Sequence, residues 1–242
     1  MKIVFSVFSV FLCLVFITSL SGCTYNVPKG YTNKHHSYEE VLSFARSIDP
    51  DAAVTNRPTD SQDQYSWKFR EWDAVINGVS CHVASVAELI ENKGFAEGIF
   101  VKVYYRIATD YDYVVLNNLL NEKYPDWSVD NDSRSRYHQN DKTIFVRLKL
   151  TEYRMLSDDE LEQVWQTASQ ISEEYAKYSI DTKAGFSVPS PEKRFDEVSG
   201  EYYVRNESFT HITGFTPQEK EEFLQKYTDN WALVDTALPD GN

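Results

Sequence analysis

The 242-residue sequence is poor in cysteine, glycine and proline, and it has no excess of positive charge. Its 3 cysteines are too few for a disulfide scaffold, and 9 glycines with 8 prolines are too few for a fibrous or low-complexity chain. A formal net charge of -13 argues against a nucleic-acid-binding protein, because phosphate contacts need an excess of lysine and arginine. The hydrophobic content of 42% is too high for an intrinsically disordered chain. The composition therefore predicts a globular protein that does not bind nucleic acid.

Familiar catalytic and metal-binding motifs are missing as well. The sequence contains no G-x-S-x-G nucleophile elbow, no H-E-x-x-H, no phosphate-binding G-x-x-x-x-G-K-[ST] loop and no C-x-x-C pair. Ser190-Pro-Glu-Lys193 has the S-x-x-K spacing of penicillin-binding enzymes, but the prolines on either side of Ser190 favour extended backbone, so we predict a loop. Asp130-Asn-Asp132 begins like a calcium-binding loop, but Ser135 stands where that loop needs glycine. The sequence predicts no metal and no other cofactor.

The N-terminus is an apolar segment behind a single positive charge. Residues 3–20 are almost wholly apolar and follow Lys2, as in a secretory signal peptide, although the run is also long enough for a membrane span. The segment ends in Leu20-Ser-Gly-Cys23, which resembles the lipobox of bacterial lipoproteins at every position. The resemblance implies cleavage after Gly22 and a lipid on Cys23. An uncleaved anchor helix with a chance cysteine is the alternative.

The lipobox resemblance also implies a place in the cell and a division of the chain. Residues 1–22 would be the signal peptide, residues 23–36 a flexible tether and residues 37–242 a single globular domain or two packed lobes. The two or three acyl chains of a lipoprotein would hold it on the extracytoplasmic face of the cell membrane, or on an outer membrane if the organism has one. The membrane is therefore the first expected partner.

Helical and strand patterns are distinct along the rest of the chain. Capping boxes predict helices that begin after Ser37, Ser157 and Thr216, and apolar spacing predicts a fourth helix over about 112–123. Alternation of apolar residues predicts strands at 65–76, 79–88, 98–108 and 143–153, and weaker strands at 52–56, 127–133, 200–205 and 231–236. Asn77-Gly78 suits a type I′ hairpin turn between the first two strands. The sequence predicts an α+β fold, with about four helices packed on an antiparallel sheet.

One pattern indicates an internal repeat. A helix followed closely by a short strand is predicted three times, with junctions at Pro50–Val54, Pro125–Val129 and Asp229–Leu233. A duplicated α–β unit explains the pattern, and so does the ordinary likeness of any short helix that leads into a strand. Both explanations stay open.

Histidines and one thiol are the candidates for reactive chemistry. His82, His138 and His211 could act as bases if the fold brings carboxylates to them, whereas His35 and His36 are predicted to lie in the solvated tether. Cys81 alternates with Val79 and Val83, so we predict a buried, unreactive thiol. No residue is assigned a catalytic role.

Aromatic side chains make up 14% of the sequence and point to a binding surface. Phe100, Tyr104 and Arg106 share one face of the 98–108 strand, and Trp67 and Phe69 from the preceding hairpin are predicted to join them on an exposed surface. We interpret the protein as a membrane-anchored binding or interaction module of the cell envelope, with an envelope or secreted protein as its partner. An envelope hydrolase that uses carboxylate and histidine chemistry, and a structural envelope component, are the alternatives.

Overall fold

A computed structural model describes residues 29–62, 68–91, 101–130, 137, 142–198 and 200–237. These residues form four helices and nine strands in two sheets. In chain order the elements are α2 (Tyr38–Ile48), β1 (Ala53–Val54), β2 (Thr59–Gln62), β3 (Lys68–Ile76), β4 (Val79–Glu91), β5 (Val101–Thr109), α3 (Tyr111–Lys123), β6 (Trp127–Val129), β7 (Thr143–Leu148), α5 (Asp158–Tyr175), β8 (Lys183–Asp196), β9 (Glu201–Ile212) and α6 (Pro217–Ala237). The α+β prediction is confirmed, with the strands divided between two mostly antiparallel sheets.

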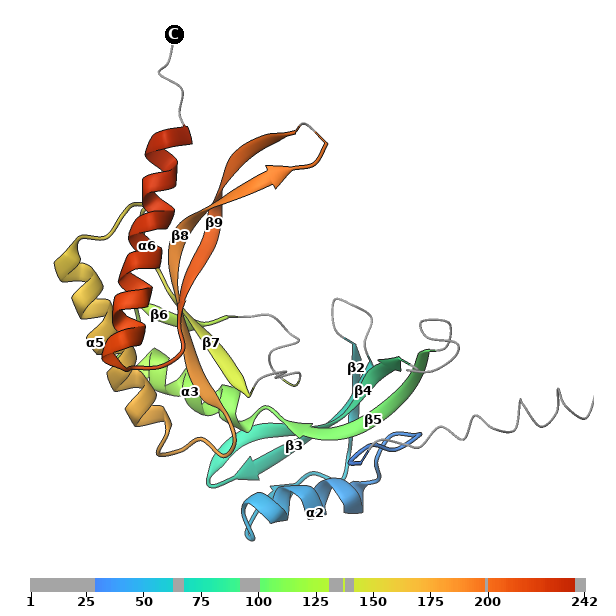
Figure 1. Cartoon of the computed structure of the whole chain (residues 1–242). Helices are drawn as coiled ribbons and strands as arrows, with labels where there is room; N and C mark the ends of the chain where they lie inside the picture. The colour runs from blue at the N-terminus through green and yellow to red at the C-terminus, as the bar shows by residue number, and fades with distance from the viewer. Residues whose placement is uncertain are drawn as a thin grey trace, which may run out of the picture.

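The first sheet is antiparallel throughout. Its strands follow the order β1-β3-β4-β5, and β2 also pairs with β3. Asn77 and Gly78 join β3 to β4 with φ values of 48° and 75°, as the predicted type I′ turn requires. Helix α2, held at its start by the Ser37–Glu40 capping box, buries Val41 and Ala45 against one face of this sheet (Figure 1).

The second sheet is mixed and follows the order β6-β7-β8-β9. Strands β7 and β8 are parallel because α5 crosses between them, whereas the other two pairs are antiparallel. Ile144, Val146 and Leu148 of β7 are buried, as their alternation predicted. Helices α3, α5 and α6 lie on that same side of the sheet, and the β8–β9 hairpin projects beyond its neighbours (Figure 1).

The two sheets share one hydrophobic core. A continuous cluster of buried side chains runs from Val41 on α2 to Tyr227 on α6. Helix α3 connects the sheets, because it follows β5, packs on β4 and leads into β6. From this helix the sheets diverge into the two arms of a V (Figure 1).

The expected tether contains ordered structure before its predicted end at His36. Thr32 pairs with Tyr105 of β5 through two backbone hydrogen bonds of 2.8 and 2.9 Å. His36 is buried, and its backbone N–H donates to the Ser85 hydroxyl at 3.0 Å. His35 packs its ring on Tyr105, with centroids 4.2 Å apart. The prediction of a solvated tether is therefore wrong for residues 31–36, because β5 and the buried Ser85 bind this stretch.

Two other local predictions are wrong. The expected strand at 231–236 is part of α6, where Trp231 lies one helical turn after Tyr227 and their rings are 6.3 Å apart. The third helix–strand junction of the proposed repeat is therefore absent, while α2–β1 and α3–β6 supply the first two. The expected loop around Ser190 is part of strand β8, which agrees with the extended backbone that its two neighbouring prolines favour.

Candidate functional site

The predicted aromatic surface is largely buried. Phe69 is 6% exposed and Tyr104 is 2% exposed, while Trp67 and Phe100 lie outside the described residues. Phe69 and Arg106 do share a sheet face, because both lie opposite Val86. The prediction of an exposed surface is wrong for Phe69 and Tyr104. Tyr137 packs over this face, and its ring centroid lies 5.6 Å from that of Phe69.

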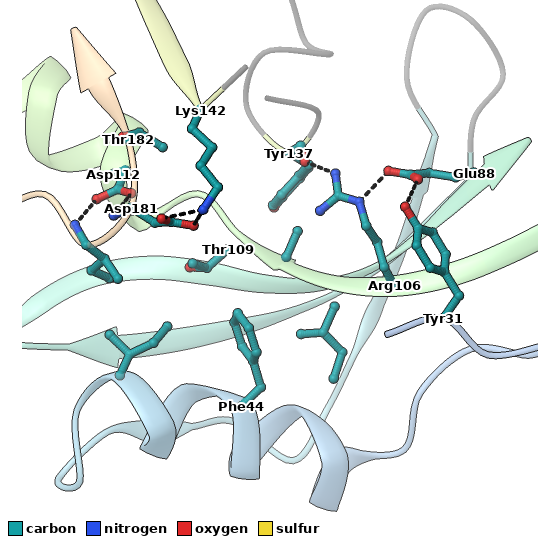
Figure 2. A pocket seen from close by; sticks show the side chains of 14 residues that line it. Tyr31, Phe44, Glu88, Arg106, Thr109, Asp112, Tyr137, Lys142, Asp181 and Thr182 are labelled. Carbon is teal, nitrogen blue, oxygen red and sulfur yellow. Dashed lines mark hydrogen bonds and ion pairs between the residues drawn. The ribbon is translucent and has the colours of Figure 1, made fainter. Parts of the chain in front are cut away.

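A cleft of about 580 Å³ runs along strand β5, on the side away from β4 (Figure 2). Its apolar wall consists of Phe44 and Ile48 from α2 together with Ile107 of β5. The opposite wall is polar and carries charged side chains from β4, from β5, from the residue before β7 and from the turn before β8. The cleft thus offers two chemically different walls along one strand.

One end of the polar wall centres on Arg106, the member of the predicted surface that the structure leaves accessible. Its guanidinium pairs with Glu88 and also donates to the backbone carbonyl of Tyr137. The Tyr31 hydroxyl donates to the same Glu88 carboxylate at 2.6 Å. Burial, reinforced by this carboxylate, raises the pKa of Tyr31, so the phenol stays protonated and remains a donor.

The other end of the polar wall is an ion pair on a fixed turn. The Lys142 ammonium lies 2.5 Å from a carboxylate oxygen of Asp181, and both side chains are well exposed. Asp112 fixes the turn that carries Asp181. Its buried carboxylate accepts the backbone N–H groups of Ile180 at 2.8 Å and Asp181 at 3.3 Å. The cleft therefore has a rigid rim at its junction with the second sheet.

Lys142 also has an unusual backbone. Its φ is 52°, in the left-handed region that side-chain-bearing residues rarely occupy. Its carbonyl accepts the backbone N–H of Lys183 at 2.7 Å, which ties this conformation to the first pair of β7 and β8. Such strained residues concentrate at binding sites, where the surrounding fold determines their geometry.

Two of the predicted histidines are described, and one meets a carboxylate. The buried Asp110 carboxylate accepts hydrogen bonds from the backbone N–H of His82 at 2.5 Å and from its ring Nδ1–H at 2.9 Å. On the other side of the ring, Nε2 lies 3.5 Å from an oxygen of the exposed Asp73. His211 instead contacts the Ser187 hydroxyl at 3.1 Å, and burial lowers its pKa, whereas His138 lies outside the described residues.

The Cys81 thiol has the surroundings of an inert group. Cys81 is buried in the shared core, on the opposite sheet face from His82. Burial, with a smaller contribution from Asp110, raises the pKa of the thiol to about 12. A thiol of that pKa is protonated at neutral pH, which accords with the buried, unreactive state that the alternation predicted.

Neither a metal site nor similarity to a known protein indicates the function. Within the described parts of the chain, no group of three or more histidine, cysteine, aspartate or glutamate side chains is placed to hold a metal ion, and no helix is long and apolar enough to cross a membrane. No protein-family model matches the sequence, and no curated protein or solved structure is significantly similar to it. The function must therefore be argued from the cleft itself.

Proposed function

We propose that the mature chain is a lipid-anchored binding module of the cell envelope, and that it binds an extended segment of a partner protein along the outer edge of β5. The lipid on Cys23 that the lipobox resemblance implies would supply the anchor. The observation that carries the proposal is the cleft along β5, with its apolar and charged walls. The proposal keeps the interaction role predicted from the sequence. It differs in the binding surface, which is the outer edge of β5 and not the aromatic face of the sheet.

The backbone of β5 is suited to strand addition. Over the described residues, the outer edge of β5 is paired at Tyr105, which exchanges both backbone hydrogen bonds with Thr32. In an antiparallel ladder the same edge is presented by every second residue, so Ile107 and Thr109 direct their backbone N–H and C=O groups into the cleft. An incoming peptide would continue the ladder from Thr32 toward the start of α3.

The two walls would select the side chains of that peptide. Successive residues of an added strand point to opposite sides, so one set would meet Phe44 and Ile48 and the other would meet Arg106 and Lys142. Because Glu88 and Asp181 pair with these cations, the polar wall can receive either charge. The fitting segment alternates apolar residues with charged or polar ones.

Site-specific photo-crosslinking in cells tests this proposal. A photoreactive amino acid at Lys142, on the cleft rim, is expected to capture one partner protein through a defined segment. The same amino acid at Lys177, an exposed lysine after α5, is the matched control and should capture nothing specific.

A second variant separates strand addition from mere proximity. Ile107→Pro removes a backbone donor from the outer edge, while the β4 side of the strand is bonded through its neighbours Arg106 and Ala108. Loss of the crosslink at an unchanged melting temperature supports strand addition. An unaltered crosslink in Ile107→Pro, or equal capture from Lys142 and Lys177, would refute it.

The hydrolase alternative has one specific observation in its favour. The Asp110–His82 contact resembles the orienting half of an acid–base pair, since a buried carboxylate fixes the ring through Nδ1. On the other side of the ring, Nε2 lies 3.5 Å from the Asp73 carboxylate. Hydrolysis of wall fragments by the full chain, abolished in His82→Gln and retained in Asp73→Asn, would favour this second function.

A further inference from the structure

A second concave site lies in the other arm of the V, where strand β7 stops. The last residue of β7 that pairs with β8 is Arg147, opposite Ser187, while β8 itself continues to Asp196 together with β9. The end of β7, the following loop and the hairpin enclose a notch of about 650 Å³. This notch is separate from the cleft along β5, and the two share no lining residue.

The notch gathers positive charge in a strongly acidic chain. Arg147, Lys149 and Arg205 line it, although the chain carries only 24 Lys+Arg against 37 Asp+Glu. Two carboxylates lie close by. Asp130 is 3.1 Å from the Arg147 guanidinium, and Glu192 interacts with Arg194 and Arg205. The Lys149 ammonium donates to the Pro125 carbonyl at 2.8 Å and keeps its charge. Three cations against two carboxylates leave a local positive balance, where the chain as a whole would repel anions.

The groups in the notch are mainly hydrogen-bond donors. The Arg147 guanidinium lies over the Phe209 ring at 4.1 Å, which fixes its plane. Within the described residues, its buried Nε has no hydrogen-bond partner. The Tyr153 hydroxyl at the rim also remains a donor, because burial raises its pKa to about 12. A donor-rich groove is satisfied by a ligand with many acceptor oxygens.

The strand edge beside the notch discourages a peptide. Pro189 and Pro191 fall on the part of β8 that extends past β7, and each proline removes a backbone donor from that strand. Prolines on an edge strand are a known device against strand addition. Recognition here must therefore rely on the side chains.

The positive charges are spread along the notch and do not converge on one point. Arg147 lies level with Ser187, and Arg205 lies level with Glu192 on the same strand. Five residues at about 3.3 Å each separate these levels by roughly 16 Å. A ligand with several charged groups along its length can contact Arg147 and Arg205 at the same time, each through a group of its own.

From this arrangement we infer that the notch at the end of β7 binds a linear oligoanion whose repeating units carry phosphate groups. Phosphate is favoured over carboxylate because each group presents more acceptor oxygens to the guanidinium and hydroxyl donors. The inference does not depend on the partner proposed for the β5 cleft.

Calorimetric titration of the full chain in detergent tests the inference, with short-chain polyphosphate as the probe. Oligogalacturonate, a linear carboxylate, and a neutral maltooligosaccharide serve as comparison ligands. Arg205→Ala removes one exposed cation of the notch, and Arg46→Ala removes an equally exposed cation on α2 as the matched control. We expect polyphosphate binding to weaken about tenfold in Arg205→Ala and to stay unchanged in Arg46→Ala.

The possible outcomes are distinct. Polyphosphate binding that depends on Arg205, with no heat from the maltooligosaccharide, supports the inference. Absence of polyphosphate binding, equal weakening in both variants, or a preference for oligogalacturonate would overturn it. Because Arg205 is exposed, its replacement should not alter the melting temperature, which is measured alongside.

Discussion

The buried carboxylate of Asp110 connects the first sheet to the helix that leads into the second. It precedes α3 directly and holds both the backbone and the ring of His82 on β4. A fully buried carboxylate is expensive to desolvate, and these two hydrogen bonds offset part of that cost.

Asp110→Asn should therefore lower the free energy of unfolding by about 2 kcal/mol, because the amide can keep the backbone contact but loses the charged acceptor of the ring Nδ1–H. Urea unfolding monitored by tryptophan fluorescence measures the change. Asp73→Asn, on the exposed side of the same histidine, should change stability by less than about 0.5 kcal/mol. An equal loss of unfolding free energy in Asp110→Asn and Asp73→Asn would contradict this structural role of Asp110.

At the residue scale the sequence identified His82 as a candidate but could not identify its partner. Asp110 is separated from it by 28 positions, and only the pairing of β4 with β5 brings them together. The Glu88–Arg106 pair could have been predicted, because the alternation of apolar residues on the two predicted strands places both residues on the same face of the sheet. The burial of Phe69 could not be predicted, because Tyr137, which packs on it, comes from another part of the chain.

At the scale of single elements, α5 begins with a carboxylate that supports the helix. Glu160 accepts the Ser157 backbone N–H at 2.8 Å and pairs with Arg154 at 2.5 Å. The Arg154 guanidinium, together with that backbone N–H, lowers the pKa of Glu160 to about 2. Because the pKa is lower in the folded state, the contribution is present above about pH 4.5 and is lost as the pH falls toward 2.

Glu160→Gln should accordingly destabilise the protein at pH 7 and much less at pH 3. Urea unfolding of the variant and the wild type at both pH values gives the difference in their free energy of unfolding at each pH. Glu173→Gln removes the same charge from an exposed position on the same helix and provides the control. A destabilisation of Glu160→Gln that is as large at pH 3 as at pH 7 would show that the carboxylate charge is not what matters.

The parallel pair of β7 and β8 depends on a glycine. A Cβ atom on Gly185 would lie 2.9 Å from both a Phe145 ring carbon and a Thr143 methyl group. Gly185→Ala should lower the free energy of unfolding by about 1–3 kcal/mol through overpacking. Thermal unfolding of the double variant Gly185→Ala, Phe145→Leu should show partial recovery, and a single variant as stable as wild type would contradict this close contact.

Element prediction succeeded where the signal was local. The capping box at Ser157 and the turn at Asn77-Gly78 act within a few residues, so their helix and hairpin were predicted correctly. The stretch 231–236 was misread as a strand, because its first residue, Trp231, instead continues a helix and packs against Tyr153 and Tyr227. In so short a segment the apolar pattern fits a strand and a helix equally well, and tertiary packing selects the helix.

At the scale of the whole molecule, the candidate site depends on how two sheets meet. The charged wall of the cleft draws Glu88 and Arg106 from the first sheet, and Lys142 and Asp181 from the ends of second-sheet elements. The sequence pointed to Arg106 as a surface residue, whereas nothing in the sequence singles out Lys142 or Asp181. Their meeting follows from the position of α3 between the sheets, which no local pattern encodes.

The proposed anchor makes a prediction about the intact protein. In cells fed a labelled fatty acid, the wild-type chain should carry the label and fractionate with membranes. Cys23→Ala should lose the label, whereas Cys81→Ala should retain it because that thiol is buried. Label in Cys23→Ala, or a wild-type chain that keeps residues 1–22, would refute lipidation at Cys23.

The central claim is that the outer edge of β5 receives a strand from a partner while the chain is anchored in its membrane. Amide hydrogen exchange at Ile107 and Thr109 measures this most directly, in isolated native membranes and in the purified full chain. The account predicts that exchange at both amides is at least about tenfold slower in membranes, with no change at Tyr105, whose amide already bonds Thr32. Equal exchange at Ile107 and Thr109 in the two preparations would contradict it.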